Sequence, residues 1–160
     1  MRRHIQPASP AQEAGLPGQS AERTASPAAQ GLRVLLADDE PVSQLLVEAV
    51  LARWGIRPAL AADGEEAVHM AHFAAFDLVL MDLVMPVLDG VASTRRIRAF
   101  SRDSKTSSKV PIIAYSSLDL EHDRALLQRV GLSDVLSKPC NSESLRTCLE
   151  QWCPDKFWRY

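Results

Sequence analysis

Three kinds of side chain suited to phosphoryl chemistry follow short apolar runs of this sequence: carboxylates, a hydroxyl and an amine. Neighbouring carboxylates repel one another, so they need a neutralising cation if all are to be ionised at neutral pH. Oxygen ligands without His or Cys favour a hard ion, of which Mg²⁺ is the best candidate. A magnesium ion held by carboxylates beside a lysine would form a site for a phosphoryl group. The residues concerned are Asp38, Asp39, Asp82, Ser116 and Lys138.

The alternative interpretation of each residue is ordinary. Asp38 on its own would be a solvated loop residue or a helix cap, and only the combination after four separate runs favours a site. Other phosphoryl-handling motifs are missing from the sequence, including GxxxxGK[ST], GxGxxG after the first run, and the GxSxG elbow. The Asp38-Asp39 pair also differs from the Asp-x-Asp pair of haloacid-dehalogenase-like phosphatases.

The apolar runs are typical of buried strands, and amphipathic or capped segments separate them. The predicted strands are Arg33–Ala37, Arg57–Leu60, Asp77–Met81, Val110–Ala114 and Asp134–Leu136. The predicted helices run from Pro41 to Gly55, from Asp63-Gly64 onward, from Asp89-Gly90 through Phe100, over Asp119–Val130, and over Asn141–Trp152 with Asn141 as N-cap.

Two features of the first predicted helix bear on the site. Val42, Leu45 and Leu46 share one face with Ala49 and Val50, the pattern of an amphipathic helix that packs on a sheet. Ser43 is interpreted as a solvated helix residue.

Strands that alternate with helices predict a parallel sheet covered on both faces by right-handed crossovers. In such sheets the binding crevice lies beyond the carboxyl ends of the strands. The candidate residues all follow strands, so we expect them to gather at one edge of the sheet.

The sequence resembles the receiver domains of response regulators in bacterial two-component signalling. The resemblance implies an α/β, flavodoxin-like (βα)5 fold, with a five-stranded parallel sheet of order 2-1-3-4-5 and helices on both faces. The matching segments are LLADDEP (Leu35–Pro41), AADGEEA (Ala61–Ala67), DLVLMDLVMPVLDG (Asp77–Gly90), VPIIAYSS (Val110–Ser117) and GLSDVLSKP (Gly131–Pro139).

The resemblance assigns the phosphoryl group and the metal to particular residues. Asp82 matches the phospho-accepting aspartate, which attacks the phosphorus of a phosphohistidine. Asp38 and Asp39 match the acid pair that holds Mg²⁺. Direct metal ligands would come from Asp39 and Asp82, Asp38 would act mainly through water, and the backbone carbonyl of Val84 would complete the protein ligands.

The resemblance also assigns the groups that respond to the phosphoryl group. Lys138 matches the lysine that pairs with a phosphoryl oxygen, and Ser116 matches the switch hydroxyl.

Two positions depart from the family pattern. Val84 is apolar and cannot hold an attacking water, which predicts slow self-dephosphorylation. Val135 stands where many members carry a rotating aromatic residue, and Tyr115 is expected to pack in the core.

The two ends of the chain differ from its middle. Residues 1–30 hold four of the ten prolines and few large apolar side chains, which predicts a disordered tail. Residues 31–153 form the predicted receiver domain, and residues 154–160 form an aromatic C-terminal tail. That tail either folds back on the domain or is an exposed docking segment.

Composition narrows the functional classes. A net charge of −2 gives no electrostatic case for binding nucleic acid. The apolar runs are too short for a membrane span, and HIQPASPAQ is not a signal peptide. Three cysteines without CxxC spacing predict reduced thiols and a cytoplasmic location.

These expectations combine into one functional hypothesis, a stand-alone receiver that switches binding to a partner protein. It would be phosphorylated by a sensor histidine kinase or a histidine phosphotransfer protein, with Mg²⁺ as cofactor. It would signal through the surface at about Asp119–Trp152, formed by the fourth helix, fifth strand and fifth helix. It would not be an enzyme beyond its own phosphorylation and dephosphorylation. The alternatives are a phosphorelay intermediate, an unphosphorylated adaptor and a metal-dependent phosphatase.

Overall fold

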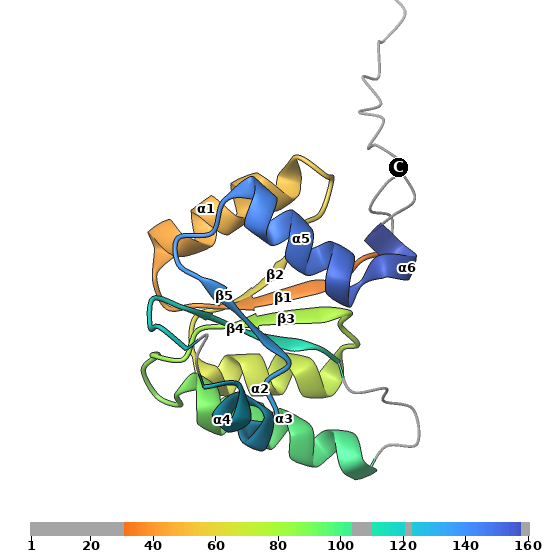
Figure 1. Ribbon diagram of the computed structural model, residues 1–160. Helices are drawn as coiled ribbons and strands as arrows, with labels where there is room; N and C mark the ends of the chain where they lie inside the picture. The colour runs from red at the N-terminus through yellow and green to blue at the C-terminus, as the bar shows by residue number, and fades with distance from the viewer. Residues whose placement is uncertain (1–30, 104–109, 121–122, 158–160) are drawn as a thin grey trace, which may run out of the picture.

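The computed structural model describes residues 31–103, 110–120 and 123–157. The predicted disordered tail, residues 1–30, lies outside these residues, as do the aromatic residues Trp158 and Tyr160. Within the described parts, strands and helices alternate along the chain and form three layers (Figure 1). None of the described helices is long and apolar enough to cross a bilayer.

The middle layer is one parallel sheet in the order β2-β1-β3-β4-β5, which confirms the expected order. Residues Val34 to Ala37 of β1, Leu78 to Met81 of β3 and Ile112 to Ser116 of β4 are all buried, as expected of parallel strands covered on both faces. The strands are β1 (Val34–Ala37), β2 (Ala59–Ala61), β3 (Leu78–Met81), β4 (Ile112–Ser116) and β5 (Asp134–Ser137).

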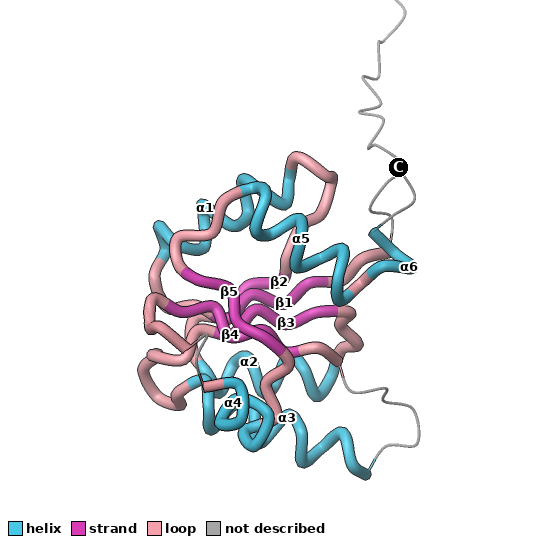
Figure 2. The backbone as a smooth tube through the Cα atoms, in the orientation of Figure 1, coloured by secondary structure: helices cyan, strands magenta, loops and turns pink. Residues whose placement is uncertain are grey.

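The outer layers are helical. Helices α1 and α5 cover one face of the sheet, and α2, α3 and α4 cover the other (Figures 1 and 2). The short α6 lies beside the end of α5. The bounds are α1 (Pro41–Ala52), α2 (Gly64–Phe73), α3 (Gly90–Asp103), α4 (Arg124–Val130), α5 (Ser142–Trp152) and α6 (Pro154–Phe157).

Alternate residues of the central strands build two separate cores. Leu36, Leu80 and Ile113 belong to the cluster beneath α1 and α5. Their neighbours Leu35 and Val79 belong to the cluster beneath α2, α3 and α4. This alternation follows from the two-residue period of a strand, which sends successive side chains to opposite faces. The sheet is therefore fixed from both sides, and its carboxyl edge is a rigid platform.

Local side-chain signals fix where several helices begin. The Asp63 side chain accepts a 2.8 Å hydrogen bond from the Glu66 amide at the start of α2. Asn141 accepts one of 2.8 Å from the Ser144 amide and forms a capping box, which confirms Asn141 as the N-cap of α5. Gly131 ends α4 with φ 100°, a conformation that favours glycine.

The predicted start of the fourth helix is wrong. Helix α4 begins at Arg124, and Asp119 and Leu120 are not helical, while residues 121–122 lie outside the described chain. The Asp123 carboxylate accepts a 3.1 Å hydrogen bond from the Leu126 amide, so Asp123 is the N-cap. Asp119 does not take that role, and the loop after β4 is correspondingly longer.

Helix α1 presents to solvent the face that the apolar pattern assigned to the sheet. Val42 is 63% exposed and Leu45 is 65% exposed. The buried residues of α1 are instead Ser43, Val47 and Leu51, spaced four residues apart. The expectation that Ser43 is solvated is therefore wrong, since this residue is only 6% exposed.

The C-terminal helix packs on the domain. The ring of Phe157 lies edge to face with that of Trp54, with 5.5 Å between centroids. Lys156 Nζ lies 2.8 Å from Asp77 Oδ1, at the start of β3. Through Phe157, which is 8% exposed, the described part of the aromatic tail folds back rather than standing free.

Candidate functional site

Asp38 follows β1 directly and is completely buried. Its amide donates a 3.0 Å hydrogen bond to the Ala61 carbonyl, which continues the pairing of β1 with β2 by one residue. Its Oδ1 accepts a 2.9 Å hydrogen bond from the Glu40 amide. The carboxylate is thus held by a backbone donor at the carboxyl edge of the sheet, where sequence reasoning placed it.

Asp82 follows β3 and occupies the adjacent position. Its amide donates to the Ala37 carbonyl at 2.8 Å, and its Oδ1 accepts from the Val84 amide at 3.0 Å. The chain folds tightly here, because a Cβ at Gly90 would collide with the Asp82 carbonyl oxygen. Gly90 therefore allows the start of α3 to pass close behind the aspartate.

The acids Asp38, Asp39 and Asp82 form one cluster. Each offers a carboxylate oxygen, and these atoms all lie within 4.8 Å of one another. Asp39 is exposed, whereas Asp38 and Asp82 are buried. The cluster opens into a cleft of about 640 Å³ that Val84, Ser116 and Lys138 also line. Three clustered carboxylates with one side open to solvent fit a hard divalent cation such as Mg²⁺.

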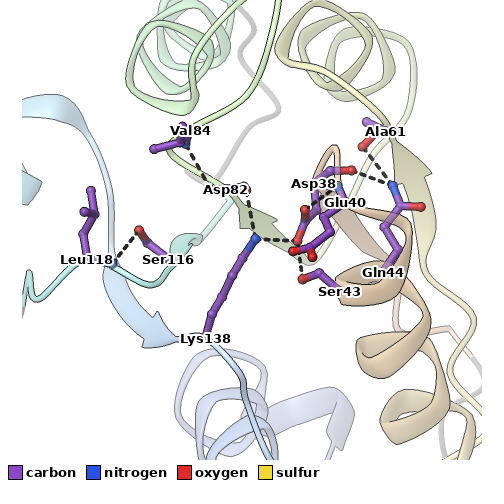
Figure 3. Close-up of polar contacts among 10 residues, drawn as sticks. All are labelled: Asp38, Glu40, Ser43, Gln44, Ala61, Asp82, Val84, Ser116, Leu118 and Lys138. Atoms are coloured by element: carbon purple, nitrogen blue, oxygen red, sulfur yellow. Dashed lines mark hydrogen bonds and ion pairs between the residues drawn. The ribbon is translucent and has the colours of Figure 1, made fainter.

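Lys138, which follows β5, reaches between the two buried acids (Figure 3). Its Nζ lies 2.7 Å from Asp38 Oδ2 and 2.9 Å from Asp82 Oδ2. Burial alone would lower the pKa of the Lys138 ammonium, but the hydrogen bonds and charges of the two aspartates outweigh it and raise the pKa. The ammonium also lies 4.9 Å from the centroid of the Tyr115 ring, a cation–π contact.

Ser116, the last residue of β4, lines the same cleft as Asp39 and Asp82. Its Oγ accepts a 3.1 Å hydrogen bond from the Leu118 amide, in the loop that leads to α4 (Figure 3). Its carbonyl accepts a 2.9 Å bond from the Lys138 amide. The hydroxyl therefore holds the loop after β4, and a new bond to a group in the cleft would compete with that contact.

Sequence reasoning missed two residues of α1 that hold Asp38. Ser43 Oγ donates to Asp38 Oδ2 at 2.5 Å, and Gln44 Nε2 donates to the Asp38 carbonyl at 2.6 Å. The four-residue spacing of Ser43, Val47 and Leu51 was the available signal, because these residues share one helix face. The more conspicuous apolar face obscured it.

A family comparison agrees with this geometry. The sequence model of the response regulator receiver domain family matches residues 34–150, which include all the candidate site residues. The chain belongs to this family. The fold and the parallel strand order are those of its CheY-like members. The acid cluster of this receiver lies at the carboxyl edge of the sheet, within the matched residues.

Two curated relatives illustrate the range of proteins that contain such domains. The receiver is 36% identical over 120 residues to the sensor protein GacS of Pseudomonas syringae, covering 75% of this chain and 13% of GacS. It is 35% identical over 113 residues to PilH of Pseudomonas aeruginosa, covering 71% of this chain and 90% of PilH. The chain thus spans a small part of one relative and nearly all of the other.

Solved structures give the same picture. The receiver domain of a sensor histidine kinase from Pseudomonas aeruginosa PAO1, crystallised with a magnesium ion in its active site cleft, is 40% identical. It matches with a TM-score of 0.66 over 76% of this chain and 97% of that chain. The receiver domain of Ssk1 from Saccharomyces cerevisiae, crystallised with the phosphotransfer protein Ypd1, is 26% identical with a TM-score of 0.69, covering 81% and 94%.

Proposed function

We propose that this receiver accepts a phosphoryl group on Asp82 from a phosphohistidine and thereby switches its binding to a partner protein. The observation that carries the proposal is the position of Lys138, whose Nζ joins Asp38 and Asp82 within 2.9 Å. A part-buried ammonium between carboxylates, in a cleft open on one side, is arranged to exchange its partners for an incoming anion. The donor would be a sensor histidine kinase or a histidine phosphotransfer protein.

The transfer step is a displacement at phosphorus. An Asp82 carboxylate oxygen forms the new P–O bond while the P–N bond to the donor histidine breaks, and the electron pair returns to the imidazole nitrogen. No protein base is required, because the nucleophile is already an anion. Lys138 pairs with a phosphoryl oxygen, and the Val84 amide continues to orient the Asp82 carboxylate through Oδ1. Catalysis by this chain extends only to the gain and loss of its own phosphoryl group.

The three clustered acids would hold Mg²⁺, as would the Val84 carbonyl that the family resemblance adds. When bound, the cation supplies charge neutralisation for the carboxylates and the phosphoryl oxygens. The receiver domain that was crystallised with magnesium in its cleft supports this assignment.

An apolar rim around the cleft supports docking of a protein donor. Val42, Leu46 and Val84 line the cleft and are 63%, 49% and 67% exposed. Leu45 extends this surface along α1 at 65% exposure. Exposed apolar side chains grouped around a polar site are one mark of a protein–protein contact. A helical donor could cover this rim while presenting its phosphohistidine to Asp82.

The output surface that we propose is formed by α4, β5 and α5. Phosphorylation would draw the Ser116 hydroxyl toward the phosphoryl group and release its 3.1 Å bond to the Leu118 amide. The freed loop leads directly to α4, so the population of its conformations shifts. Val135 on β5 cannot provide the aromatic rotation of other members, which leaves this loop as the proposed carrier of the change.

A second candidate is a phosphorelay intermediate that passes the group to a histidine phosphotransfer protein. Its support is the similarity to the receiver domain of a sensor histidine kinase at 40% identity, and to a receiver crystallised with a phosphotransfer protein at 26%. Transfer from the phosphorylated receiver to a histidine phosphotransfer protein would favour this role.

The free thiols of Cys140, Cys148 and Cys153 suit a reducing compartment, and we propose a cytoplasmic location.

The deciding experiment is phosphorylation by acetyl phosphate with Mg²⁺, followed by mass spectrometry of the intact protein. We expect one added phosphoryl group on the wild type and none on Asp82→Ala. Asp155→Ala, which changes an exposed acid of α6, is the matched control and should behave as the wild type. Equal modification of wild type and Asp82→Ala would refute the assignment, and failure of the wild type to be modified would favour an unphosphorylated adaptor.

A further inference from the structure

Ser43 is a buried polar residue beside the acid cluster. It lies in the first turn of α1, is 6% exposed, and lines the cleft. Its hydroxyl donates to Asp38 Oδ2 at 2.5 Å (Figure 3). The N-cap of α1 is Glu40, which makes no side-chain cap. The Ser43 hydroxyl thus bonds the Asp38 carboxylate, which follows β1, and does not cap its own helix.

The three donors to the Asp38 carboxylate differ in what else they serve. The Glu40 amide bonds Oδ1 and is fixed by the backbone. Lys138 bonds Oδ2 but is shared with Asp82, and it is the group that would turn to a phosphoryl oxygen. Ser43 serves Oδ2 of Asp38 alone among the acids. When Lys138 changes partner, Ser43 is the donor that remains on Oδ2.

A serine hydroxyl has one proton, and the 2.5 Å bond directs that proton of Ser43 to Asp38 Oδ2. Ser43 therefore has no second proton to donate elsewhere while it holds the carboxylate. The hydroxyl is committed to Asp38 in this arrangement.

We propose that Ser43 is a positioning residue that keeps the Asp38 carboxylate in its metal-binding orientation. The inference rests on the proposed function, since it assigns a role within the same site. A carboxylate that loses one of two donors on Oδ2 can rotate, and binding of a hard cation depends on a fixed set of oxygens. The metal-free acid cluster would then be less well organised when Ser43 is replaced.

The test compares Ser43→Ala with Ser43→Thr, which keeps the hydroxyl. Isothermal titration with Mg²⁺ gives the affinity, and urea unfolding without metal gives the stability. We expect about a tenfold weaker Mg²⁺ affinity for Ser43→Ala and recovery to within about threefold for Ser43→Thr. Fluorine NMR of bound beryllofluoride should rank the proteins in the same way, with the lowest occupancy in Ser43→Ala.

Ser93→Ala is the matched control, because Ser93 is also buried but donates to the Asp89 carbonyl one turn earlier. We expect its Mg²⁺ affinity to equal that of the wild type. Ser43→Cys keeps nearly the same volume but offers only a weak S–H donor, and it should weaken Mg²⁺ affinity by about threefold to tenfold. This variant keeps the proposal testable if Ser43→Ala does not fold.

The possible results separate the two proposals. If Ser43→Ala binds Mg²⁺ as tightly as the wild type, or if Ser43→Thr is as weak as Ser43→Ala, then Ser43 is not a positioning residue. If Ser43→Ala folds poorly and Ser43→Cys has wild-type affinity, then Ser43 only packs α1. If the wild type itself binds neither Mg²⁺ nor beryllofluoride, the proposed function is refuted, and the role of Ser43 that rests on it is refuted too.

Discussion

Lys138 Nζ lies 2.9 Å from Asp82 Oδ2, so the proposed phosphoryl acceptor is already paired with the group that would receive the phosphoryl oxygens. The same ammonium lies 2.7 Å from Asp38 Oδ2. The lysine therefore acts as an internal counter-ion for two buried acids. Any cation that enters the cluster shares this role with Lys138, which links metal binding to the stability of the domain.

Replacing Lys138 by Met should destabilise the metal-free protein by about 3 kcal/mol, because two buried carboxylates lose their charged partner. Mg²⁺ should then stabilise Lys138→Met more than it stabilises the wild type, since the cation supplies the missing positive charge. Urea unfolding with and without Mg²⁺ measures both effects. Equal stabilisation of the two proteins by the metal would contradict the counter-ion role.

Val84 should make the phosphorylated protein long-lived. Its side chain lines the cleft, is 67% exposed, and has no polar atom to hold an attacking water. Val84→Asn should accelerate loss of the phosphoryl group by about tenfold, which corresponds to about 1.4 kcal/mol of barrier. The measurement is the decay of phosphoprotein with Mg²⁺ and no phosphatase.

Val87→Asn is the control for that decay, because Val87 belongs to the same loop and is 78% exposed. It should leave the lifetime unchanged. A wild-type lifetime of a few seconds, or equal acceleration by both variants, would remove Val84 as the cause.

The same Val87 substitution should stabilise the fold. Val87 has φ 68°, in the left-handed region that β-branched residues rarely adopt, whereas Asn tolerates it. We expect Val87→Asn to raise the free energy of unfolding by about 1 kcal/mol. Val42→Asn replaces a valine of similar exposure in helical conformation, and it should give no gain in urea unfolding.

The packing of α6 can be tested by shortening the chain after Cys153. We expect a lower melting temperature, because the truncation removes Phe157 from Trp54 and Lys156 from Asp77. Phe157→Ala alone should cost about 3 kcal/mol in urea unfolding. An unchanged melting temperature for both proteins would show that α6 contributes nothing to the fold.

Two buried thiols should make stability fall at high pH. Burial, with the charge of Asp134 as the next cause, raises the pKa of Cys148 to about 12. Burial, with the charge of Asp77, raises that of Cys153 to about 11. The unfolded chain releases these protons near the ordinary thiol pKa, so the folded state binds more protons from about pH 9 upward.

The contribution of the thiols is therefore complete below about pH 9 and is lost as the pH rises toward their folded pKa values. Urea unfolding at pH 8 and at pH 10 should show a smaller decrease in Cys148→Ala/Cys153→Ala than in the wild type. Identical decreases in the two proteins would show that the thiols ionise as readily in the folded state.

The sequence predicted the sheet and the acid cluster because both depend on local patterns. Apolar runs such as DLVLM specify buried parallel strands, and a residue that follows such a strand must lie at the carboxyl edge. Asp38, Asp82 and Lys138 meet there for that reason.

The inner side of α1 could not be predicted in the same way. A helix in which both faces carry aliphatic residues has no unique orientation from its periodicity alone. Tertiary contacts decide it: Ser43 and Gln44 bond Asp38, and these bonds turn Val42 and Leu45 to solvent. The start of α4 was missed for a related reason, since Asp119 and Asp123 are both acceptable caps.

The bond between Lys156 Nζ and the Gly31 carbonyl, 3.5 Å long, brings the first and last described segments of the domain together. Both segments lie near the start of β3, where Asp77 contacts Lys156, and the acid cluster follows the other end of that strand. A domain whose ends are adjacent can be inserted into a longer polypeptide at a single point without disturbing its interior. Such an architecture suits a portable module, because sequences joined to its ends attach at the side of the sheet away from the acid cluster.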